Sequence, residues 1–267
     1  MDDRPIGVFD SGLGGLTVVK ELNRLLPEES IVYFGDTARV PYGTRSRDTV
    51  MKYSEQCIRF LLSKDIKMVI VACNTVSATS LEALKKKFDI PILGVIEPGA
   101  LAAVKATRNK RVGVIGTGGT IKSGAYPAAI KRLDPGISVF EKACPLFVPI
   151  VEEGWSGTEV ARLTAREYLA GIKDSGVDTL VLGCTHYPLL SGVISEVMGP
   201  DVRLVNPAEG TAARAREILM AEGLKRESKA PASTGFYVSD IGERFQTIGG
   251  HFLNKDINAE YIEIEKY

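Results

Sequence analysis

The stretch "VIVACNTVSA" at residues 69–78 and the stretch "TLVLGCTHYPLL" at residues 179–190 share one arrangement. Each is a short apolar run that ends in a small residue and a cysteine, followed by hydroxyl or amide side chains. Short apolar runs of this kind are typical of strands that are buried on both faces of a parallel sheet. Cys73 and Cys184 therefore stand at matching places, at the ends of two predicted strands.

The same kind of apolar run recurs along the chain. Between the runs lie segments such as 16–26 and 48–65, whose apolar residues recur at intervals of three and four and predict helices. Strands that alternate with helices in this way are typical of a parallel sheet with helices on both faces. The predicted strands cover residues 5–10, 30–36, 68–73, 90–96, 111–117, 177–184 and 201–207.

Two glycine-containing turns also match each other. The segment "IGVFDSGLGG" (6–15) aligns with "VGVIGTGGT" (112–120), and each reads as a strand, a sharp turn and the start of a helix. Any two α/β domains share such features, but cysteines at matching strand ends favour an internal duplication. We therefore predict an α/β fold of two pseudo-symmetric domains, each a mostly parallel sheet flanked by helices, with the active site in the cleft between them.

The end of the chain is expected to return to the first domain. A helical segment (209–224) is followed by a polar stretch (225–234) and by a strand-like run (235–240). The last residues, 259–267, alternate apolar and charged side chains, as in a strand at a sheet edge. The predicted domains are residues 1–97 plus 208–267, and residues 98–207.

Composition argues against several classes of partner and site. Lys and Arg number 33, as do Asp and Glu, and without a clustered basic surface we expect no nucleic-acid or membrane partner. No stretch reaches the roughly 20 apolar residues that span a bilayer, and the N-terminal residues lack a signal-peptide pattern. The four cysteines form no CxxC pair and there are two histidines, so we expect no metal site and no disulfides. The expected compartment is a reducing cytoplasm.

The turns after the strands do not fit nucleotide binding. Ligands of open parallel sheets gather beyond the carboxyl ends of the strands. The turns "GLGGLT" (12–17) and "GTGGTI" (116–121) both lack the final glycine of the dinucleotide-binding motif, and Ile121 stands where a P-loop requires glycine. Asp10, at the first turn, would also repel a phosphate group.

The same turns fit a small carboxylate better. Backbone N–H groups at helix N-termini bind such an anion without lysine or arginine, and Asp10 would suit an ammonium group of the same ligand. Together these features indicate an amino acid, although some of the hydroxyl side chains would serve only as N-caps. The polar side chains beside the turns are Ser11, Asn74, Thr75, Thr117 and Thr185.

Cys73 and Cys184 are interpreted as reactive thiols, because nearby helix N-termini would lower their pKa from about 8.5. Cys57 is interpreted as a buried residue of a helix, and Cys144 is given no role. Three chemistries fit the two thiols: a redox pair, a nucleophilic Cys184 with His186 as its base, and proton transfer at both faces of a carbon. The last uses both cysteines, because inverting a stereocentre requires a base on one face and an acid on the other.

Five motifs together resemble the glutamate racemases, which belong to the cofactor-independent aspartate/glutamate racemase family. The resemblance extends to about residue 210. It implies interconversion of L- and D-glutamate without a cofactor, a supply of D-glutamate for peptidoglycan, and a homodimer. The motifs are "GVFDSGLGGL" (7–16), "PYG" (41–43), "ACNT" (72–75), "IGTGGTIKSGAY" (115–126) and "GCTHYP" (183–188).

The resemblance also implies a role for each site residue. Cys73 would act on D-glutamate and Cys184 on L-glutamate, as alternating acid and base. Asp10 and His186 would assist the two thiols or hold the substrate amine, and Glu152 would be either a further helper or an ordinary surface glutamate. The residues expected to hold substrate are Asp10, Ser11, Tyr42, Gly43, Asn74, Thr75, Thr117 and Thr185.

Two alternatives stay open at this point. An aspartate racemase of the same two-cysteine superfamily would differ in substrate, and turnover of aspartate against glutamate separates the two. A non-catalytic protein that binds amino acids would have the same fold, and its cysteines could be replaced by serine without effect.

Overall fold

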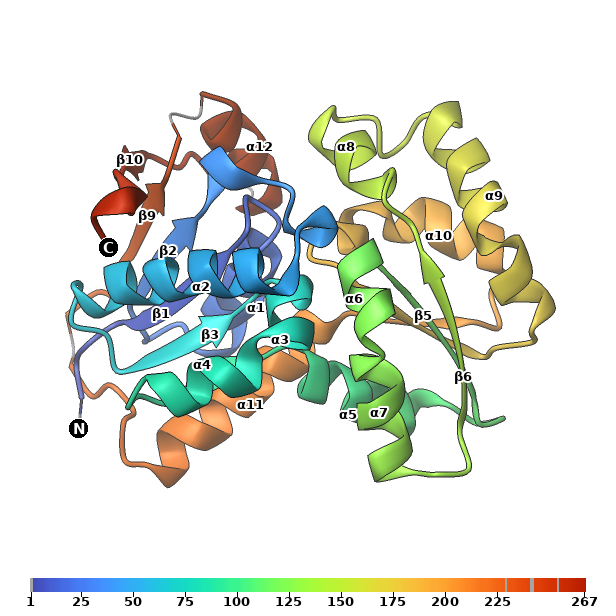
Figure 1. Ribbon diagram of the computed structural model, residues 1–267, viewed down its shortest axis with the longest axis horizontal. Coiled ribbons are helices and arrows are strands. Elements are labelled where there is room, and N and C mark those ends of the chain that lie inside the picture. Colours follow the sequence, from blue (N-terminus) through green and yellow to red (C-terminus); the bar gives the residue numbers. More distant parts are fainter. Residues whose placement is uncertain (1, 229, 241–242, 254) are drawn as a thin grey trace.

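The computed structural model describes residues 2–228, 230–240, 243–253 and 255–267, and its strands form two parallel sheets (Figure 1). We call each sheet with its helices a lobe. The first sheet has the order β10-β9-β2-β1-β3-β4, and its strands are β1 (Ile6–Asp10), β2 (Ile31–Gly35), β3 (Met68–Val71), β4 (Ile92–Gly94), β9 (Thr234–Val238) and β10 (Ala259–Tyr261). The second has the order β6-β5-β7-β8, and its strands are β5 (Arg111–Gly116), β6 (Ser138–Ala143), β7 (Thr179–Gly183) and β8 (Arg203–Val205).

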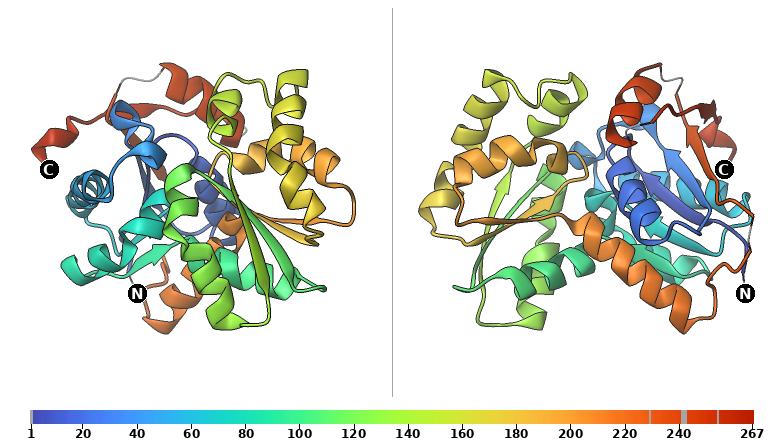
Figure 2. Two further views of the ribbon diagram at one scale, coloured as in Figure 1. Left: turned by 45° about the vertical axis from the view of Figure 1, so that its right-hand side comes forward. Right: turned by 180° about the vertical axis from the view of Figure 1, so that it is seen from behind.

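Helices cover both faces of each sheet (Figures 1 and 2). The first lobe contains α1 (Leu16–Leu25), α2 (Arg47–Leu62), α3 (Asn74–Thr79), α4 (Leu81–Lys87), α11 (Pro207–Ala221), α12 (Glu243–Leu253) and the short 3-10 helices η1 (Thr37–Arg39), η2 (Tyr42–Thr44) and η4 (Ile264–Lys266). The second contains α5 (Ile96–Ala106), α6 (Gly118–Ser123), α7 (Ala125–Leu133), α8 (Phe147–Glu152), α9 (Glu159–Asp174), α10 (Ser191–Met198) and η3 (Tyr187–Leu190).

Strand β1 shows why the strands read as unbroken apolar runs. All five of its residues are buried. Ile6 and Val8 belong to the core cluster that contains the apolar residues of α1, whereas Phe9 belongs to the cluster that contains those of α2. Because successive side chains of a strand point to opposite faces, a sheet with helices on both faces needs apolar residues at every position.

The two sheets repeat one strand order. The order β2-β1-β3-β4 in the first corresponds to β6-β5-β7-β8 in the second, and the neighbouring strands of both sheets run parallel. Cys73 lies just beyond β3, and Cys184 follows the corresponding strand β7. The predicted pseudo-symmetric α/β fold is therefore confirmed.

The tail returns to the first sheet, as predicted, because β9 pairs with β2 and β10 pairs with β9. The prediction of one edge strand over 259–267 was partly wrong: β10 ends at Tyr261, and residues Ile264–Lys266 form η4, which buries Ile264 beside α2. Strand β6 was not predicted, because its residues are only half-buried or exposed and include Glu141 and Lys142. The division into residues 1–97 plus 208–267 and 98–207 stays a prediction.

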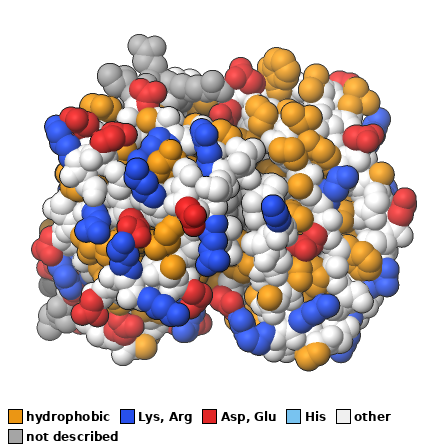
Figure 3. All heavy atoms as spheres, in the orientation of Figure 1, with side chains coloured by type: hydrophobic (Ala, Val, Ile, Leu, Met, Phe, Trp, Pro, Cys, Tyr) orange, Lys and Arg blue, Asp and Glu red, His pale blue; other side chains and the backbone are white. Residues whose placement is uncertain are grey.

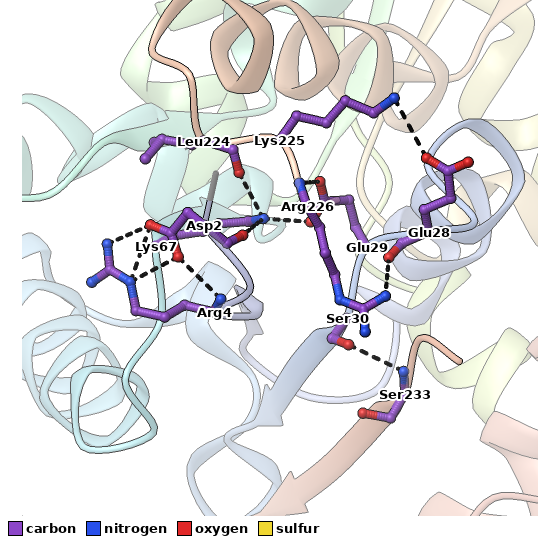
Figure 4. A network of polar contacts seen from close by, with 10 residues as sticks. All are labelled: Asp2, Arg4, Glu28, Glu29, Ser30, Lys67, Leu224, Lys225, Arg226 and Ser233. Carbon is purple, nitrogen blue, oxygen red and sulfur yellow. Dashed lines mark hydrogen bonds and ion pairs between the residues drawn. The ribbon is translucent and has the colours of Figure 1, made fainter. Parts of the chain in front are cut away.

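A buried ion pair lies at the amino-terminal end of the first sheet (Figure 4). The Lys67 ammonium group is 2.5 Å from the Glu29 carboxylate, and the two side chains are 0% and 1% exposed. Lys67 also donates to the carbonyls of Asp2 and Leu224, at 2.9 and 2.8 Å, and Glu29 accepts from the backbone N–H of Arg226 at 2.9 Å. These contacts join the first residues of the chain, the residue that precedes β3, and the segment after α11.

Charged side chains of both signs are interspersed on the face shown in Figure 3. Hydrophobic side chains gather on the same face over α8 and α9, and exposed apolar residues of that part of the chain include Leu146, Trp155, Val160 and Leu163. In the described part of the chain, every helix is too short or too polar to cross a membrane.

Candidate active site

A cavity of about 380 Å³ lies between the two lobes, beyond the carboxyl ends of β1, β3, β5 and β7. This is the edge at which parallel sheets place their ligands. Asp10 does not line the cavity but lies fully buried at the end of β1. The other residues that the sequence singled out line it: Ser11, Tyr42, Gly43, Cys73, Asn74, Thr75, Thr117, Glu152, Cys184, Thr185 and His186.

Cys73 faces the cavity from the first lobe. It is the N-cap residue of α3 and is only 5% exposed. Its Sγ is 3.6 Å from the Ser11 hydroxyl. Ser11 follows β1, which pairs with β3, so the two turns lie side by side. The thiol is therefore held where the neighbouring strands β1 and β3 of the first sheet end.

Cys184 faces the same cavity from the second lobe, with a histidine and a carboxylate behind it. Its Sγ is 4.0 Å from Nδ1 of His186, and Nε2 of His186 is 3.0 Å from Oε1 of Glu152. Glu152 is the last residue of α8, and its side chain is 22% exposed. The sequence left open whether Glu152 is an ordinary surface residue, and the structure places it on the cavity wall, in contact with His186.

Asp10 lies beneath the first glycine-containing turn. Its Oδ2 accepts a hydrogen bond from the backbone N–H of Gly12 at 3.1 Å. A Cβ atom at Gly15 would lie 2.5 Å from the Asp10 Cβ atom, so glycine is required for the turn to pass over the carboxyl group. Burial raises the pKa of Asp10, while His186 and the backbone N–H groups of the turn act in the opposite direction.

The polar residues of the cavity also join the lobes. The hydroxyls of Thr75 and Thr117 are 2.9 Å apart, and the Tyr126 hydroxyl donates to Oδ1 of Asn74 at 2.8 Å. On the other side of the site, the Thr17 hydroxyl donates to the carbonyl of Thr185 at 3.2 Å. Each contact pairs a group of one lobe with a group of the other, so the cavity walls hold each other in place.

Tyr42 lines the cavity, but its hydroxyl is bonded inside the first lobe. Its side chain is 1% exposed, and its hydroxyl donates to the carboxylate of Asp36 inside the first lobe. Gly43, the next residue, packs against Thr117, where an added Cβ atom would lie 2.7 Å from the threonine Cβ atom. The hydroxyl of Tyr42 is thus engaged with the protein interior.

The expectation of a lowered thiol pKa was wrong for Cys73. Burial raises the pKa of Cys73 to about 12, and the negative charge of Asp10 acts in the same direction. The backbone N–H of Val76, in α3, and the hydrogen bond between Cys73 and the Ser11 hydroxyl lower its pKa, as predicted for a helix N-terminus, but they are the smaller effect. Cys73 is therefore a neutral thiol at pH 7.

His186, unlike Cys73, is charged at pH 7. Burial lowers its pKa, but the hydrogen bonds to Cys184 and Glu152 raise it, and the net pKa is about 10. The imidazole ring is therefore protonated at pH 7 and places a positive charge beside the sulfur of Cys184. The two sides of the cavity differ: a neutral thiol near a buried carboxyl group faces a thiol next to an imidazolium.

Sequence reasoning missed the apolar wall of the cavity, which is formed by Val40, Pro41, Pro145, Val148 and Pro149. Apolar residues in turns carry no chemical signature, and residues 144–149 show no clear period. No lysine or arginine is among the described residues that line the cavity, so its hydrogen-bond donors are backbone N–H groups, hydroxyls, the Asn74 amide and His186.

The other two cysteines are not among the residues that line this cavity. Cys57 is buried in α2, with its Sγ 3.9 Å from the Tyr42 hydroxyl, and Cys144 is buried after β6. Within the described ranges, no three side chains of His, Cys, Asp or Glu are grouped closely enough to hold a metal ion.

Comparison with known proteins gives consistent matches. Residues 6–215 match the family described as Asp/Glu/Hydantoin racemase. The glutamate racemase of Geobacter metallireducens is 54% identical over 266 residues, which cover 98% of each chain. The crystal structure of the Francisella tularensis glutamate racemase in complex with D-glutamate has a TM-score of 0.93 at 39% identity, with 100% of both chains covered. That of the Thermus thermophilus glutamate racemase, with beta-chloro-D-alanine, has a TM-score of 0.89 at 42% identity and the same coverage.

Proposed function

The chain belongs to the Asp/Glu/hydantoin racemase family, and from this premise we propose how it interconverts L- and D-glutamate. It is an isomerase that acts on glutamate. We propose that Cys73 and Cys184 exchange protons with the α-carbon. The observation that supports this most strongly is that the two thiols come from two different sheets and line one cavity.

The proposed step moves one proton off the α-carbon and another onto it. For L-glutamate, the Cys184 thiolate removes the α-proton, and the electron pair stays on the carbon next to the carboxylate. The Cys73 thiol then donates its proton to the opposite face, which leaves D-glutamate, a Cys73 thiolate and a Cys184 thiol. The free protein is suited to this direction, because the raised pKa keeps Cys73 protonated. For D-glutamate, the two cysteines exchange roles.

His186 and Glu152 are proposed to support the Cys184 side. The His186 imidazolium balances negative charge on the sulfur of Cys184, and Glu152 keeps the ring charged and oriented. On the other side, Asp10 is proposed to attract the substrate ammonium group. That ammonium group would offset the effect of Asp10 on Cys73, so that Cys73 gives up its proton more easily when substrate is bound.

The polar lining is proposed to hold the carboxylates of glutamate. Ser11, Asn74, Thr75, Thr117 and Thr185 offer hydroxyl, amide and backbone N–H donors, together with the backbone at Tyr42 and Gly43. Donors fixed in advance stabilise charge that develops in the transition state, and their effect is greatest where water is excluded. The apolar wall of Val40, Val148 and the prolines limits the water near the reacting carbon.

The test is α-hydrogen exchange in heavy water. Protein purified without pyridoxal phosphate should bring deuterium into the α-position of L-glutamate while the optical rotation is lost. Cys73→Ser should abolish exchange of D-glutamate and spare that of L-glutamate, and Cys184→Ser should do the reverse. Equal exchange in the parent and both variants would reject the two-cysteine mechanism. Faster turnover of aspartate than of glutamate would favour the aspartate racemase alternative, and absence of any exchange would favour a binding protein.

The setting of the reaction is also a proposal. We propose that the protein works without a cofactor in the cytoplasm, where its four buried thiols stay reduced, and that its D-glutamate enters peptidoglycan. We further propose a homodimer, which is supported by the exposed apolar side chains over α8 and α9. Light scattering coupled to size-exclusion chromatography tests the dimer, and a molar mass of one chain at micromolar concentration would reject it.

A further inference from the structure

Asp36 is a buried carboxylate that the reaction described above does not use. It follows β2, its side chain is 0% exposed, and it is not among the residues that line the cavity. Three side chains donate to it: Arg39 through Nε at 2.8 Å, Tyr42 through its hydroxyl, and Ser239 through Oγ at 2.7 Å. Its oxygens are therefore bonded to groups of the protein and do not line the substrate cavity.

One of these donors, Tyr42, belongs to the segment that forms one edge of the cavity. We call residues 40–44 the cavity lip, since all five line the cavity. Arg39 directly precedes the lip, and Tyr42 is its central residue. The backbone of the lip belongs to no sheet and forms only the short helix η2, and the Tyr42 ring packs against that of Tyr53, with 5.6 Å between the ring centroids. The bond from Tyr42 to Asp36 adds a polar anchor that helps to fix how deeply the lip sits in the first lobe.

The depth of the lip matters because Gly43 reaches the other lobe. Gly43 packs against Thr117, and its carbonyl lies 3.1 Å from the place that a Cβ atom at Gly119 would occupy. Thr117 in turn shares a hydrogen bond with Thr75. A shift of Tyr42 by a few tenths of an ångström would therefore move the contact that closes this end of the cavity.

The third donor, Ser239, joins the residues that precede the lip to the segment after β9. Ser239 follows β9, and its hydroxyl also accepts from the backbone N–H of Ala38 at 3.0 Å. Beside it, Thr37 and Asp240 exchange two hydrogen bonds, at 2.9 and 3.2 Å. Residues that lie about 200 positions apart in the sequence thus meet at the base of the cavity lip.

We propose that Asp36 is a positioning residue for substrate: it fixes the cavity lip through Tyr42 and joins it to the end of β9 through Ser239. This inference rests on the proposed function, because it assumes that the lip contacts glutamate. Asp36 acts through other residues and touches no substrate atom. Its removal should weaken substrate binding much more than it slows the chemical step.

The experiment compares Asp36→Asn with Glu29→Gln. Both remove a buried, fully hydrogen-bonded carboxylate of the first lobe, but Glu29 lies at the opposite end of the sheet. Asp36→Asn should raise KM for both glutamate enantiomers by about tenfold and change kcat by less than about threefold, as expected when an interaction shared by ground and transition state is lost. Glu29→Gln should leave KM unchanged while it lowers the urea midpoint of unfolding.

Two further variants keep the inference open to refutation if Asp36→Asn folds poorly. Tyr42→Phe should also raise KM, and the double variant should be no worse than Asp36→Asn alone, because the Tyr42 hydroxyl acts on the lip through Asp36. Ser239→Ala removes the hydroxyl that bonds to Asp36 but leaves the bond from Tyr42, and it should raise KM by about twofold. An unchanged KM in these variants, or additive effects of Asp36→Asn and Tyr42→Phe, would overturn the inference. Those results leave the proposed function intact as long as the parent protein racemises glutamate.

Discussion

The hydroxyl groups of Thr75 and Thr117 are 2.9 Å apart and link the two lobes across one end of the cavity. Thr75 lies in the first turn of α3, two residues after its N-cap Cys73, and Thr117 is the N-cap of α6. Gly43 packs against Thr117 at the same place. The distance between the lobes, and with it the distance between the two thiols, is therefore sensitive to any atom added here.

Gly43→Ala tests this sensitivity. The new methyl group would lie 2.7 Å from the Thr117 Cβ atom, so the lobes have to separate or the lip has to move. Since misplacement by about 1 Å can cost a reaction about 100-fold, we expect kcat/KM for glutamate to fall by about 10- to 100-fold. Gly171→Ala is the matched control: nothing lies within 4 Å of its Cβ position on α9. It should keep full activity and gain about 0.5–1 kcal/mol in stability.

Glu152→Gln should change the pH dependence of the reaction. Glu152 raises the pKa of His186, which is about 10, so its loss should lower that pKa by about one unit or more. When kcat/KM for L-glutamate is measured against pH, its decrease on the alkaline side should then begin at a lower pH in the variant than in the parent. A chemical-shift titration of the His186 ring supplies the direct measurement. An unchanged titration would show that Glu152 does not act on the ring.

The same pKa predicts how stability varies with pH. The pKa of His186 rises from 6.5 to about 10 on folding, so the folded state holds its proton more tightly. The resulting stabilisation is complete below pH 6.5 and is lost as the pH rises through 10. In urea unfolding, the free energy of unfolding of His186→Asn should lack this decrease between pH 6.5 and pH 10. A slope identical to that of the parent would contradict the assignment.

Cys73 should react slowly with alkylating agents in the free protein. Its pKa of about 12 leaves little thiolate at pH 8, and its side chain is buried. Iodoacetamide modification followed by peptide mass spectrometry should show the rate rising about tenfold per pH unit up to the limit of protein stability. Rapid modification at pH 7 that levels off would indicate a low pKa.

Lys67→Met should destabilise the protein without affecting catalysis. It leaves the Glu29 carboxylate buried without its cation, which typically costs about 3–5 kcal/mol. Urea unfolding should show this loss, whereas kcat and KM should stay within about twofold of the parent values. Glu217→Gln breaks an exposed ion pair with Arg214 and should cost less than about 1 kcal/mol. A loss of activity in Lys67→Met samples that are still folded would contradict this separation of roles.

The sequence allowed prediction of the buried strands, the pseudo-symmetry and the residues at the carboxyl ends of the strands, but not of the half-exposed strand β6. These depend on local patterns, because a buried parallel strand is apolar throughout and its last residues must face the ligand. The thiol pKa of Cys73 was not predictable in this way. It depends on how completely the surrounding chain removes water, and burial outweighs the effect of the helix N-terminus.

The support of the cavity lip was also beyond the sequence. Asp36 and Ser239 carry no motif, and their contact arises only because β9 pairs with β2. The sequence indicated Glu152 as a possible helper, but its contact with His186, which comes from a different strand connection, was not predicted. Contacts between distant segments depend on the order of strands in the sheet, which local periodicity does not encode.

The two thiols have unlike surroundings, with Asp10 and Ser11 on one side and His186 and Glu152 on the other. Mirror-image amino acids have equal free energies in water, so the equilibrium constant of their interconversion is one. The quotient kcat/KM must then be identical for L- and D-glutamate, whatever the difference between the sides. The asymmetry of the protein is free to make one enantiomer bind more tightly and turn over more slowly, but never to favour its formation.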